Sequence, residues 1–413
     1  MSNIDQNVRT PRAHVGFIAA LSVAFGTESL VATCLEKFEA CLGSILFSAR
    51  AYLMMDRREL VLGAFGLSSG TALSTQLANA DSSTRYGRAV RSTWAPLPVD
   101  PGKLELVRFA TLAANSHNTQ PWKFSIKENS ISIAPNYARR CPVVDPDDHH
   151  LFVSLGCATE NLMHAAAAVG LKSNPVFEND AVTIIFEKTQ PISSPLFEAI
   201  RRRQSTRAVY DGKPVSPGDL RLLEQAGIDD GVAVLIMTDR TRMAKVTEYV
   251  VRGNTSQMQD KAFMNELKAW LRFSEADAVA TMDGLFSRAS GNPSFPSWLA
   301  RPLLNFVYTE SGENDKYRAQ IDSSAGIAVF TSELNNKNHW IAAGRACQRF
   351  ALQATSLGLK YAFINQPVEV PKLRNELSSY LGLGGRRPDI VVRFGNGPDL
   401  PRSLRRPPEQ LLL

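Results

Sequence analysis

Residues 113–124 read Ala-Ala-Asn-Ser-His-Asn-Thr-Gln-Pro-Trp-Lys-Phe, and the prediction of the fold starts from this stretch. Upstream of it, apolar residues from Leu104 to Ala113 recur at helical spacing, so the stretch begins where a helix ends. Downstream, Phe124 opens an alternating pattern that predicts a strand, a short turn and a second strand through Ile133. The loop between helix and strand is dense in hydrogen-bonding side chains, which suits a flat, polar-edged heterocycle with a hydroxylated chain. A solvated helix-to-strand turn is the alternative interpretation.

The stretch also resembles a known motif. It is similar to the S-x-N-x-Q-P-W-x-F element of the FMN-dependent nitroreductase family, and specifically of its fused, Acg-type branch. In that family the loop contacts the ribityl chain and the ring of the flavin from across a dimer interface. The resemblance therefore implies a nitroreductase-like fold, FMN as the cofactor, and cofactor contacts from four residues: Asn115, Ser116, Asn118 and Gln120.

The composition is typical of a globular protein with more than one domain. The 413 residues are 44% hydrophobic and 21% charged, values ordinary for a soluble protein, and the length suggests two or three domains. The net charge of +6 is modest, and several arginines lie in short clusters at 201–203, 386–387 and 405–406. Separate clusters favour pockets for anions over a continuous nucleic-acid surface, so we expect no nucleic acid as a partner.

Neither the cysteines nor the histidines predict a metal site. The five cysteines are far apart and contain no C-x-x-C, so zinc and thioredoxin-like chemistry have little support, and most of them are expected to be buried. His149 and His150 stand beside three aspartates and could suggest a metal, but a polar turn is the favoured interpretation. The prediction is therefore that no metal binds.

A twin-arginine pattern occurs at 55–80. Its paired arginines precede a mildly apolar stretch and an Ala-x-Ala cleavage-like site at 78–80. The segment resembles a twin-arginine export signal, which implies the export machinery as a partner and a periplasmic or exported protein. Because such a signal should be N-terminal, translation is expected to start at Met54 or Met55, with 1–54 a mis-assigned or disordered extension. The alternative is an ordinary amphipathic helix with two surface arginines, and then a cytoplasmic protein.

An internal repeat is visible within a pattern of alternating helices and strands. Residues 156–172 match 344–360 at a constant offset (344 − 156 = 188), and each copy is an Ala-rich helix that ends in Gly-Leu-Lys. We therefore predict a layered α+β (α/β) fold with two related halves, 81–192 and 193–413, fused into an intramolecular pseudo-dimer that is a monomer. The alternative interpretation is that the two segments match only because both are Ala-rich helices of similar composition. Apolar strands are expected at 181–186, 232–237, 326–331 and 389–394.

The second half contains an insertion at about 241–323 that makes the two halves unequal. It has a helical pattern followed by a Gly/Pro/aromatic segment at 290–298. Long connections of this kind are often lids or binding loops. We therefore expect one competent site, with the insertion over it or over its degenerate twin.

A basic segment opens the second half and resembles the R-x-S-x-[RK] motif of nitroreductases. Arg binds a phosphate monoester through paired, charge-assisted hydrogen bonds, and alternation would place Arg203, Ser205 and Arg207 on one side of an extended segment. By resemblance, Arg203 and Ser205 take the flavin phosphate and ribityl end, and Arg207 reaches the pyrimidine edge. A solvated helix end is the alternative interpretation of the triple-Arg run.

The two halves complement each other. The first half has Trp94 where the second basic group should stand, and the second half has no Q-P-W loop. The two intact motifs thus come from different halves and predict one site between them. The family also places a basic residue on the phosphate near the C-terminus, where Arg405 aligns best, and backbone N–H groups on the flavin ring, which implies Ile364 and Asn365.

The predicted function is that of an FMN-binding, nitroreductase-like oxidoreductase. The flavin carries hydride from NAD(P)H or another reductant to a small-molecule acceptor such as a nitroaromatic or a quinone, and no side chain is required as a catalytic residue. His117 is expected to be loop structure or a flavin neighbour, not a base. No G-x-G-x-x-G fingerprint is present, so nothing in the sequence chooses between NADH and NADPH. The alternative is a flavin-binding or flavin-sequestering protein with little or no turnover.

Overall fold

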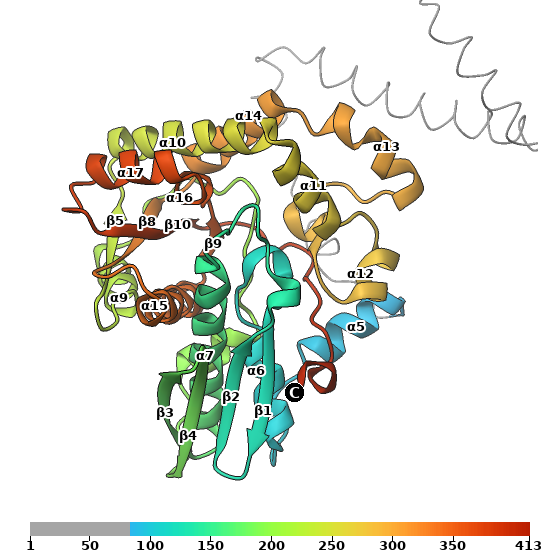
Figure 1. The fold of residues 1–413 in the computed structure, drawn as a ribbon, viewed down its shortest axis with the longest axis vertical. Helices are drawn as coiled ribbons and strands as arrows, with labels where there is room; N and C mark the ends of the chain where they lie inside the picture. Colours follow the sequence, from blue (N-terminus) through green and yellow to red (C-terminus); the bar gives the residue numbers. More distant parts are fainter. Residues whose placement is uncertain (1–82) are drawn as a thin grey trace, which may run out of the picture. The chain divides into compact units, whose positions relative to one another are not determined.

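Two antiparallel sheets of four strands each form the main β-layers of the computed structural model, which describes residues 83–413 (Figure 1). The first sheet has the strand order β1-β2-β4-β3 and the second β5-β8-β10-β9. If the four strands of each sheet are counted along the chain, both sheets place them in the same spatial order: first, second, fourth and third. The predicted α+β fold with two related halves is therefore confirmed, whereas the segments 1–54 and 55–80 lie outside the described residues. The strands are β1 (Trp122–Lys127), β2 (Ser130–Pro135), β3 (Leu171–Glu178), β4 (Ala181–Lys188), β5 (Val232–Met237), β8 (Gly326–Ser332), β9 (Lys360–Phe363) and β10 (Arg387–Gly395).

Each half has one long helix at the same position along the chain, after the second strand of its sheet and before the third. These helices, α7 (His149–Ala168) and α15 (Lys337–Ser356), have 20 residues each and start 188 residues apart (337 − 149 = 188). After them, Gly170 and Gly358 have φ of +77° and +78°, the left-handed conformation that ends a helix and favours glycine. The repeat in the sequence is thus a repeat in the structure.

The two long helices touch backbone to backbone (Figure 1). A Cβ added at Gly156 would lie 2.1 Å from the backbone O of Ile341, and a Cβ added at Gly344 would lie 2.1 Å from the backbone O of Val153. The same offset relates both contacts (341 − 153 = 188). Only glycine fits at these points, so the helices cross where a two-fold pseudo-symmetry would place them.

The predicted helix, loop and hairpin of the first half are confirmed. Helix α6 (Lys103–Thr111) ends before the loop, and a single 3-10 turn, Ser116–Asn118, lies within it. Strand β1 then pairs with β2 so that Phe124 stands opposite Ile133. A short helix, α5 (Arg85–Thr93), precedes these elements.

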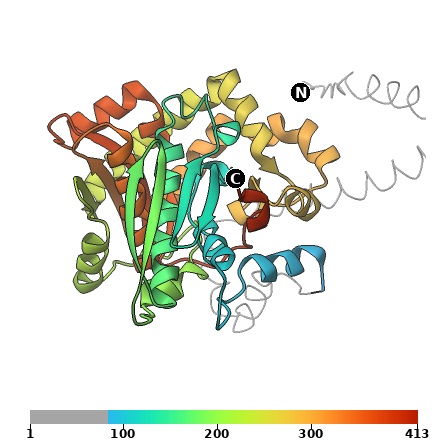
Figure 2. The ribbon, with the colours of Figure 1, turned by 60° about the horizontal axis from the view of Figure 1, so that its bottom comes forward.

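The second half carries two extra segments where the first half has tight hairpins. One joins β5 to β8 and the other joins β9 to β10, and α10 of the first segment packs on α16 and α17 of the second (Figures 1 and 2). The predicted insertion is therefore helical. Before β5 lie α8 (Pro195–Ile200) and α9 (Pro217–Ala226); the extra segments hold α10 (Arg240–Gln259), α11 (Lys261–Trp270), β6 (Leu271–Arg272), α12 (Glu275–Thr281), β7 (Leu285–Phe286), α13 (Ser297–Val307), α14 (Glu310–Asp322), α16 (Gln366–Glu369) and α17 (Pro371–Tyr380).

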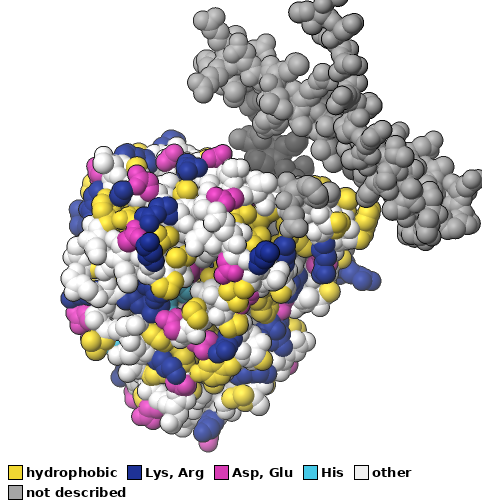
Figure 3. All heavy atoms as spheres, turned by 45° about the horizontal axis from the view of Figure 1, so that its top comes forward, with side chains coloured by type: hydrophobic (Ala, Val, Ile, Leu, Met, Phe, Trp, Pro, Cys, Tyr) yellow, Lys and Arg dark blue, Asp and Glu magenta, His cyan; other side chains and the backbone are white. Residues whose placement is uncertain are grey.

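The surface of the described residues carries charges of both signs. On the face in Figure 3, cationic and anionic side chains are interspersed. Within 83–413, no helix combines the length and apolar character that crossing a bilayer requires. The three cysteines in this range, Cys141, Cys157 and Cys347, are buried and have free thiols, as the sequence predicted.

Candidate functional site

Three arginines from distant parts of the chain meet in one pocket. Arg203 follows α8, whereas Arg402 and Arg405 belong to the segment after β10. Arg203 and Arg405 donate to backbone carbonyls at the end of α6, at 2.8 Å and 2.7 Å, which fixes both side chains against the first half. Ser205 lines the same pocket.

Among the described residues, no carboxylate forms an ion pair with this arginine cluster, although Asp399 acts on Arg402 from a longer distance and acts to raise its pKa. Arg203 is 3% exposed and Arg405 6% exposed, and neither of them nor Arg402 forms an ion pair with a described residue. Burial and the nearby guanidinium of Arg203 lower the pKa of Arg405 to about 9 and that of Arg402 to about 10. The Nε of Arg203 and the Oγ of Ser205 are buried without a hydrogen-bond partner in the described part of the chain. Buried like charges with free hydrogen-bonding atoms suit a multiply charged anion such as a phosphate.

Trp94 forms one wall of this pocket. The guanidinium carbon of Arg402 lies 4.6 Å from the centroid of its ring, and that of Arg405 lies 5.6 Å away. The indole N–H donates to the backbone O of Ser403 at 3.0 Å. Cation–π contacts of this kind orient the guanidinium groups without cancelling their charge.

The loop 115–120 forms the adjoining wall, and its backbone is strained. His117, Asn118 and Gln120 have φ of +46°, +53° and +55°. Non-glycine residues in the left-handed region are uncommon and cluster at binding sites, where the surrounding structure holds them in place. The Oδ1 of Asn115 provides such a restraint by accepting the backbone N–H of Gln120 at 2.8 Å.

Eight of the ten residues predicted to bind the cofactor line this pocket or the larger cavity next to it. The larger cavity has a volume of about 190 Å³, and Arg207 lies where it joins the pocket. The guanidinium of Arg207 has no hydrogen bond or ion pair to a described residue, so its charge faces the cavity. The eight are Asn115, Ser116, Asn118, Arg203, Ser205, Arg207, Asn365 and Arg405.

Gln120 and Ile364 line neither space. Gln120 is fully buried, donates to the backbone O of Met282 at 2.9 Å and accepts the backbone N–H of Arg406 at 2.9 Å. Ile364 is also fully buried, and its backbone N–H donates to the backbone O of Val391 at 2.9 Å. Both residues therefore make internal hydrogen bonds where the resemblance implied cofactor contacts.

The insertion forms the outer wall of the larger cavity. Gln257 of α10, Phe263 and Leu267 of α11 and Tyr317 of α14 line it, together with Tyr308 between α13 and α14. This wall is mixed, because apolar and aromatic side chains stand beside polar and charged ones such as Glu313 and Lys316. The loop 115–120 is polar. The cavity thus lies between the intact motifs and the insertion.

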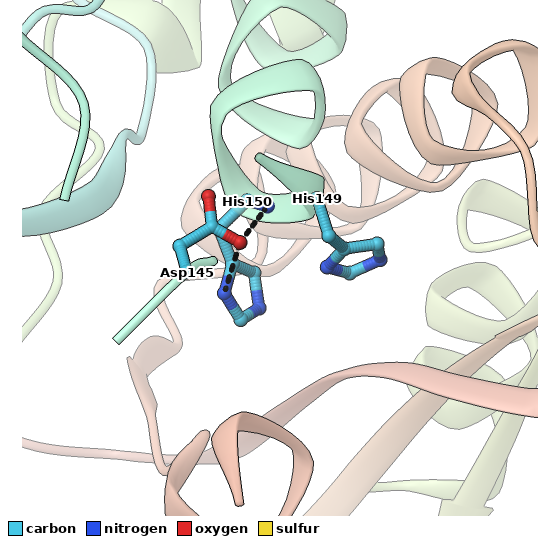
Figure 4. Close-up of side chains that lie close together, drawn as sticks. All are labelled: Asp145, His149 and His150. Carbon is cyan, nitrogen blue, oxygen red and sulfur yellow. Dashed lines mark hydrogen bonds and ion pairs between the residues drawn. The ribbon is translucent and has the colours of Figure 1, made fainter. Parts of the chain in front are cut away.

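A buried polar cluster lies at the start of α7 (Figure 4). The two carboxylate oxygens of Asp145 accept the backbone N–H groups of His150 and Leu151, at 2.9 Å each, which caps the first turn. His149 binds Asp389 through Nε2 at 2.8 Å. These bonds agree with the polar-turn interpretation, while the Nδ1 of His149 is buried without a hydrogen-bond partner in the described part of the chain. The prediction that no metal binds stays a prediction.

A second pocket lies at the position that the repeat relates to the larger cavity. Ile341, Ala342 and Arg345 line it, each 188 residues after a residue of α7 that lines the larger cavity (345 − 157 = 188). Arg345 is paired there with Asp229 at 3.5 Å and with Glu160 at 3.2 Å. The only arginine that lines this second pocket is therefore neutralised, so the two related positions differ in their charge.

Several lining residues were not predicted to contribute to the site. Arg402 stands three residues before Arg405 in the same basic run, so the run itself was a signal for it. In the sequence, Trp94 was noted only because it stands where the motif has a basic residue, and no contact was predicted for its ring. Glu369 and Tyr317 carry no motif, because α16 and the insertion bring them to the cavity only in the folded chain. His150 of α7 was considered only as part of a polar turn or a metal site.

In comparisons with known proteins, the chain is similar in sequence to proteins named as nitroreductases. No protein-family model matches the chain. Over 323 residues, the chain is 24% identical to the "Putative NAD(P)H nitroreductase MT3217" of Mycobacterium tuberculosis (strain CDC 1551 / Oshkosh), covering 74% of this chain and 90% of that protein. The "Putative NAD(P)H nitroreductase Rv3131" of Mycobacterium tuberculosis (strain ATCC 25618 / H37Rv) matches with the same values.

Two solved structures were also matched. A nitroreductase with bound FMN from Bacteroides fragilis has a TM-score of 0.31 and 16% identity, over 49% of this chain and 89% of that one. The FMN-dependent nitroreductase NfnB from Mycobacterium smegmatis, in complex with NADPH, has a TM-score of 0.34 and 13% identity, over 49% and 87%. The chain is thus similar over about three quarters of its length to mycobacterial proteins named as nitroreductases.

Proposed function

We propose that the chain is an FMN-binding oxidoreductase that carries electrons from NAD(P)H or another reductant to a nitroaromatic or quinone-type acceptor. The observation that carries this proposal is the buried, unpaired cluster of Arg203, Arg402 and Arg405 around the free Oγ of Ser205. A phosphate monoester, with nearly two negative charges, satisfies such a cluster. The similarity to proteins named NAD(P)H nitroreductases supports the same function. Together with the repeated sheet topology, it supports the fused, Acg-type branch.

The two adjoining spaces fit the parts of FMN. The arginine cluster would hold the phosphate, Asn118 and Ser205 would face the ribityl chain, and Arg207 and Asn365 would face the ring. When bound, the flavin supplies the hydride chemistry. The charge of Arg207 would favour the negative charge that the ring gains on reduction. The apolar side chains in the wall of the insertion would exclude water from the reacting atoms.

FMN titrations test the phosphate site. Arg203→Ala should weaken FMN binding about 10- to 100-fold, because a hydrogen bond to a charged group contributes about 1.5–3 kcal/mol. Arg202→Ala is the matched control, since Arg202 is the next residue in the same run but is exposed and lies outside the pocket. Quenching of flavin fluorescence measures both affinities. Equal affinities in the two variants would exclude this phosphate site.

A flavin-sequestering protein is the second candidate function. The observation that favours it is the wall of insertion residues, including Phe263 and Tyr317, which would restrict the access of a bulky acceptor to the ring. The absorbance spectrum of the FMN-loaded protein distinguishes the two functions. Bleaching on anaerobic addition of NADPH, and recovery with a quinone, support the oxidoreductase. A flavin spectrum that NADPH leaves unchanged, and that stays bleached when an acceptor is added after reduction with dithionite, supports sequestration.

We further propose that the protein is exported by the twin-arginine pathway. The support is the sequence pattern of 55–80, with its paired arginines and the Ala-x-Ala site. Replacing Arg57 and Arg58 together by Lys should keep the protein in the cytoplasm, as cell fractionation would show. Unchanged fractionation would favour the cytoplasmic alternative.

A further inference from the structure

One carboxyl group in the wall of the larger cavity has no cationic partner. Glu369 is the last residue of α16 and follows Asn365, the predicted ring neighbour, by four positions. It lines the cavity together with Gln257 and His150. The chain therefore places an ionisable group in the same space that the proposed function assigns to the flavin ring and the acceptor.

The partner of Glu369 is a neutral amide. The Nε2 of Gln257 donates to its Oε2 at 2.6 Å, and Glu369 forms no ion pair with a described residue. Glu160 provides the contrast, because it is buried with Arg349 at 2.7 Å and Arg345 at 3.2 Å. Glu160 is thus half of a structural ion pair, whereas Glu369 is held by a group that binds the protonated or the ionised carboxyl.

The surroundings of Glu369 favour its protonated form. Burial raises the pKa of Glu369, and Asp145 acts in the same direction, whereas His150, Gln257 and Arg207 oppose the shift. A carboxyl with a raised pKa holds its proton closer to neutral pH and can donate it to a bound molecule. Several ionisable groups act on Glu369 or share its cavity. They are Asp145, His150, Arg207, His117, Cys141, Cys157 and Tyr308 and, on α14, Glu313, Lys316 and Tyr317.

We propose that Glu369 is the proton donor for reduction of a quinone in this cavity. The inference rests on the proposed function. Reduction of a quinone to a hydroquinone takes up one hydride and one proton. A bound, reduced flavin would supply the hydride and would be oxidised by two electrons, and the O–H bond of Glu369 would break to give the proton to a quinone oxygen. A proton from solvent would then restore the carboxyl group.

Three side chains in the wall that the insertion contributes fit an acceptor of this class. Phe263, Leu267 and Tyr317 present hydrophobic and aromatic surface to the cavity, which suits a flat, uncharged ring. The carboxyl group of Glu369 and the amide of Gln257 supply hydrogen-bonding groups at one side of that space. A quinone offers a flat ring and carbonyl oxygens that accept hydrogen bonds.

Glu369→Gln tests the proposal, because the amide can still accept the hydrogen bond of Gln257 but has no acidic proton. The FMN-loaded protein is reduced with dithionite and mixed with a benzoquinone, and flavin reoxidation is followed by stopped-flow absorbance. We expect a rate lower on the order of 100-fold in the variant. In the wild type the rate should fall as pH rises, and in the variant it should not. Reoxidation by ferricyanide, which takes electrons without a proton, should be equal in both.

Infrared spectroscopy gives a readout that does not depend on turnover. The FMN-loaded wild type at neutral pH should show a protonated carboxyl band that Glu369→Gln lacks. Glu376→Gln on the neighbouring α17 is the matched control, because Glu376 lies outside the cavity and pairs with Arg252 at 2.8 Å, and it should leave rates and spectrum unchanged. Wild-type rates in Glu369→Gln, or the loss in Glu313→Gln instead, would overturn the assignment while the proposed function stands. Failure of the wild type to bind FMN would overturn the proposed function itself.

Discussion

Pairing with carboxylates separates the buried arginines of this chain into two kinds. Arg349 donates to Glu160 at 2.7 Å and to Asp229 at 2.8 Å. Although burial raises the pKa of Glu160, hydrogen bonds from His164 and Arg349 lower it to about 2. Arg203 and the two C-terminal arginines near it have backbone and neutral partners only. Arg349 therefore belongs to an ion-pair network that completes the fold, whereas the arginines of the pocket retain charge for a ligand. Arg393 is also buried with neutral partners only, but it lines neither the pocket nor the larger cavity.

His117 leads to a prediction about pH. Burial, with Arg207 and His150 nearby, lowers the pKa of His117 to about 4, against about 6.5 in an unfolded chain. Between these values only the unfolded chain takes up a proton, so the free energy of unfolding falls as pH drops below about 6.5 and the loss is complete near pH 4. His117→Asn removes this titration and keeps a residue that tolerates φ of +46°. It should reduce the loss between pH 7 and pH 5 by about 1 kcal/mol.

Urea denaturation of the flavin-free proteins at the two pH values measures this difference. His339→Asn, at the second pocket, is the control for replacement of a histidine on the same chain. Equal pH dependence in the wild type and in His117→Asn would show that His117 titrates normally when folded.

At the scale of elements, the crossing of α7 and α15 depends on two glycines. Gly344→Ala would place a methyl group 2.1 Å from the backbone O of Val153, and no flexible side chain can move away to relieve this contact. The helices must separate, which should lower the free energy of unfolding by about 1–3 kcal/mol. Gly218→Ala, in the first turn of α9, is the control, because its nearest atom would lie at 3.7 Å. Chemical denaturation midpoints should fall for the first variant and not for the second.

The elements that could be predicted are those with a local signal. The composition and the terminal glycines of the long repeat helices predict these helices, and runs of apolar residues predict the core strands. Strand β3 was missed because it contains Pro175 and alternates between half-buried and exposed positions. Strand β9 was missed because it has four residues. Both are held by pairing with a neighbouring strand, which no local pattern reveals.

The candidate site divides in the same way. Arg203, Ser205 and Arg207 were predictable because they share one short segment with a motif. Gln120 matches the motif too, yet its amide binds backbone groups of the insertion and of the C-terminal segment. Glu369 has no motif at all, and only the packing of α10 on α16 brings Gln257 to it. Contacts between segments far apart in sequence decide these roles.

The whole molecule is expected to bind one FMN and to act as a monomer. The two related pockets differ in charge, since Arg345 is neutralised in the second pocket, whereas Arg207 of the larger cavity has no ion pair with a described residue. We therefore expect saturation at one flavin per chain, measured from flavin and protein absorbance together. Light scattering after size exclusion should give the mass of a single chain. Two flavins per chain, or a dimer that loses its flavin when it dissociates, would contradict this prediction.

One hydrophobic core crosses the boundary between the predicted halves. Phe109 and Phe152 of the first half belong to the same buried cluster as Phe350 and Phe394 of the second. A half alone would expose the faces of its long helix and sheet that are buried here, so neither 81–192 nor 193–413 should fold by itself. Residues 81–413 without flavin should unfold in urea in one transition, with the same midpoint by circular dichroism and by tryptophan fluorescence. Two separate transitions, or a half that folds cooperatively when expressed alone, would mean that the halves are independent domains, and the glycine contact between α7 and α15 would then be an interface and not part of a common core.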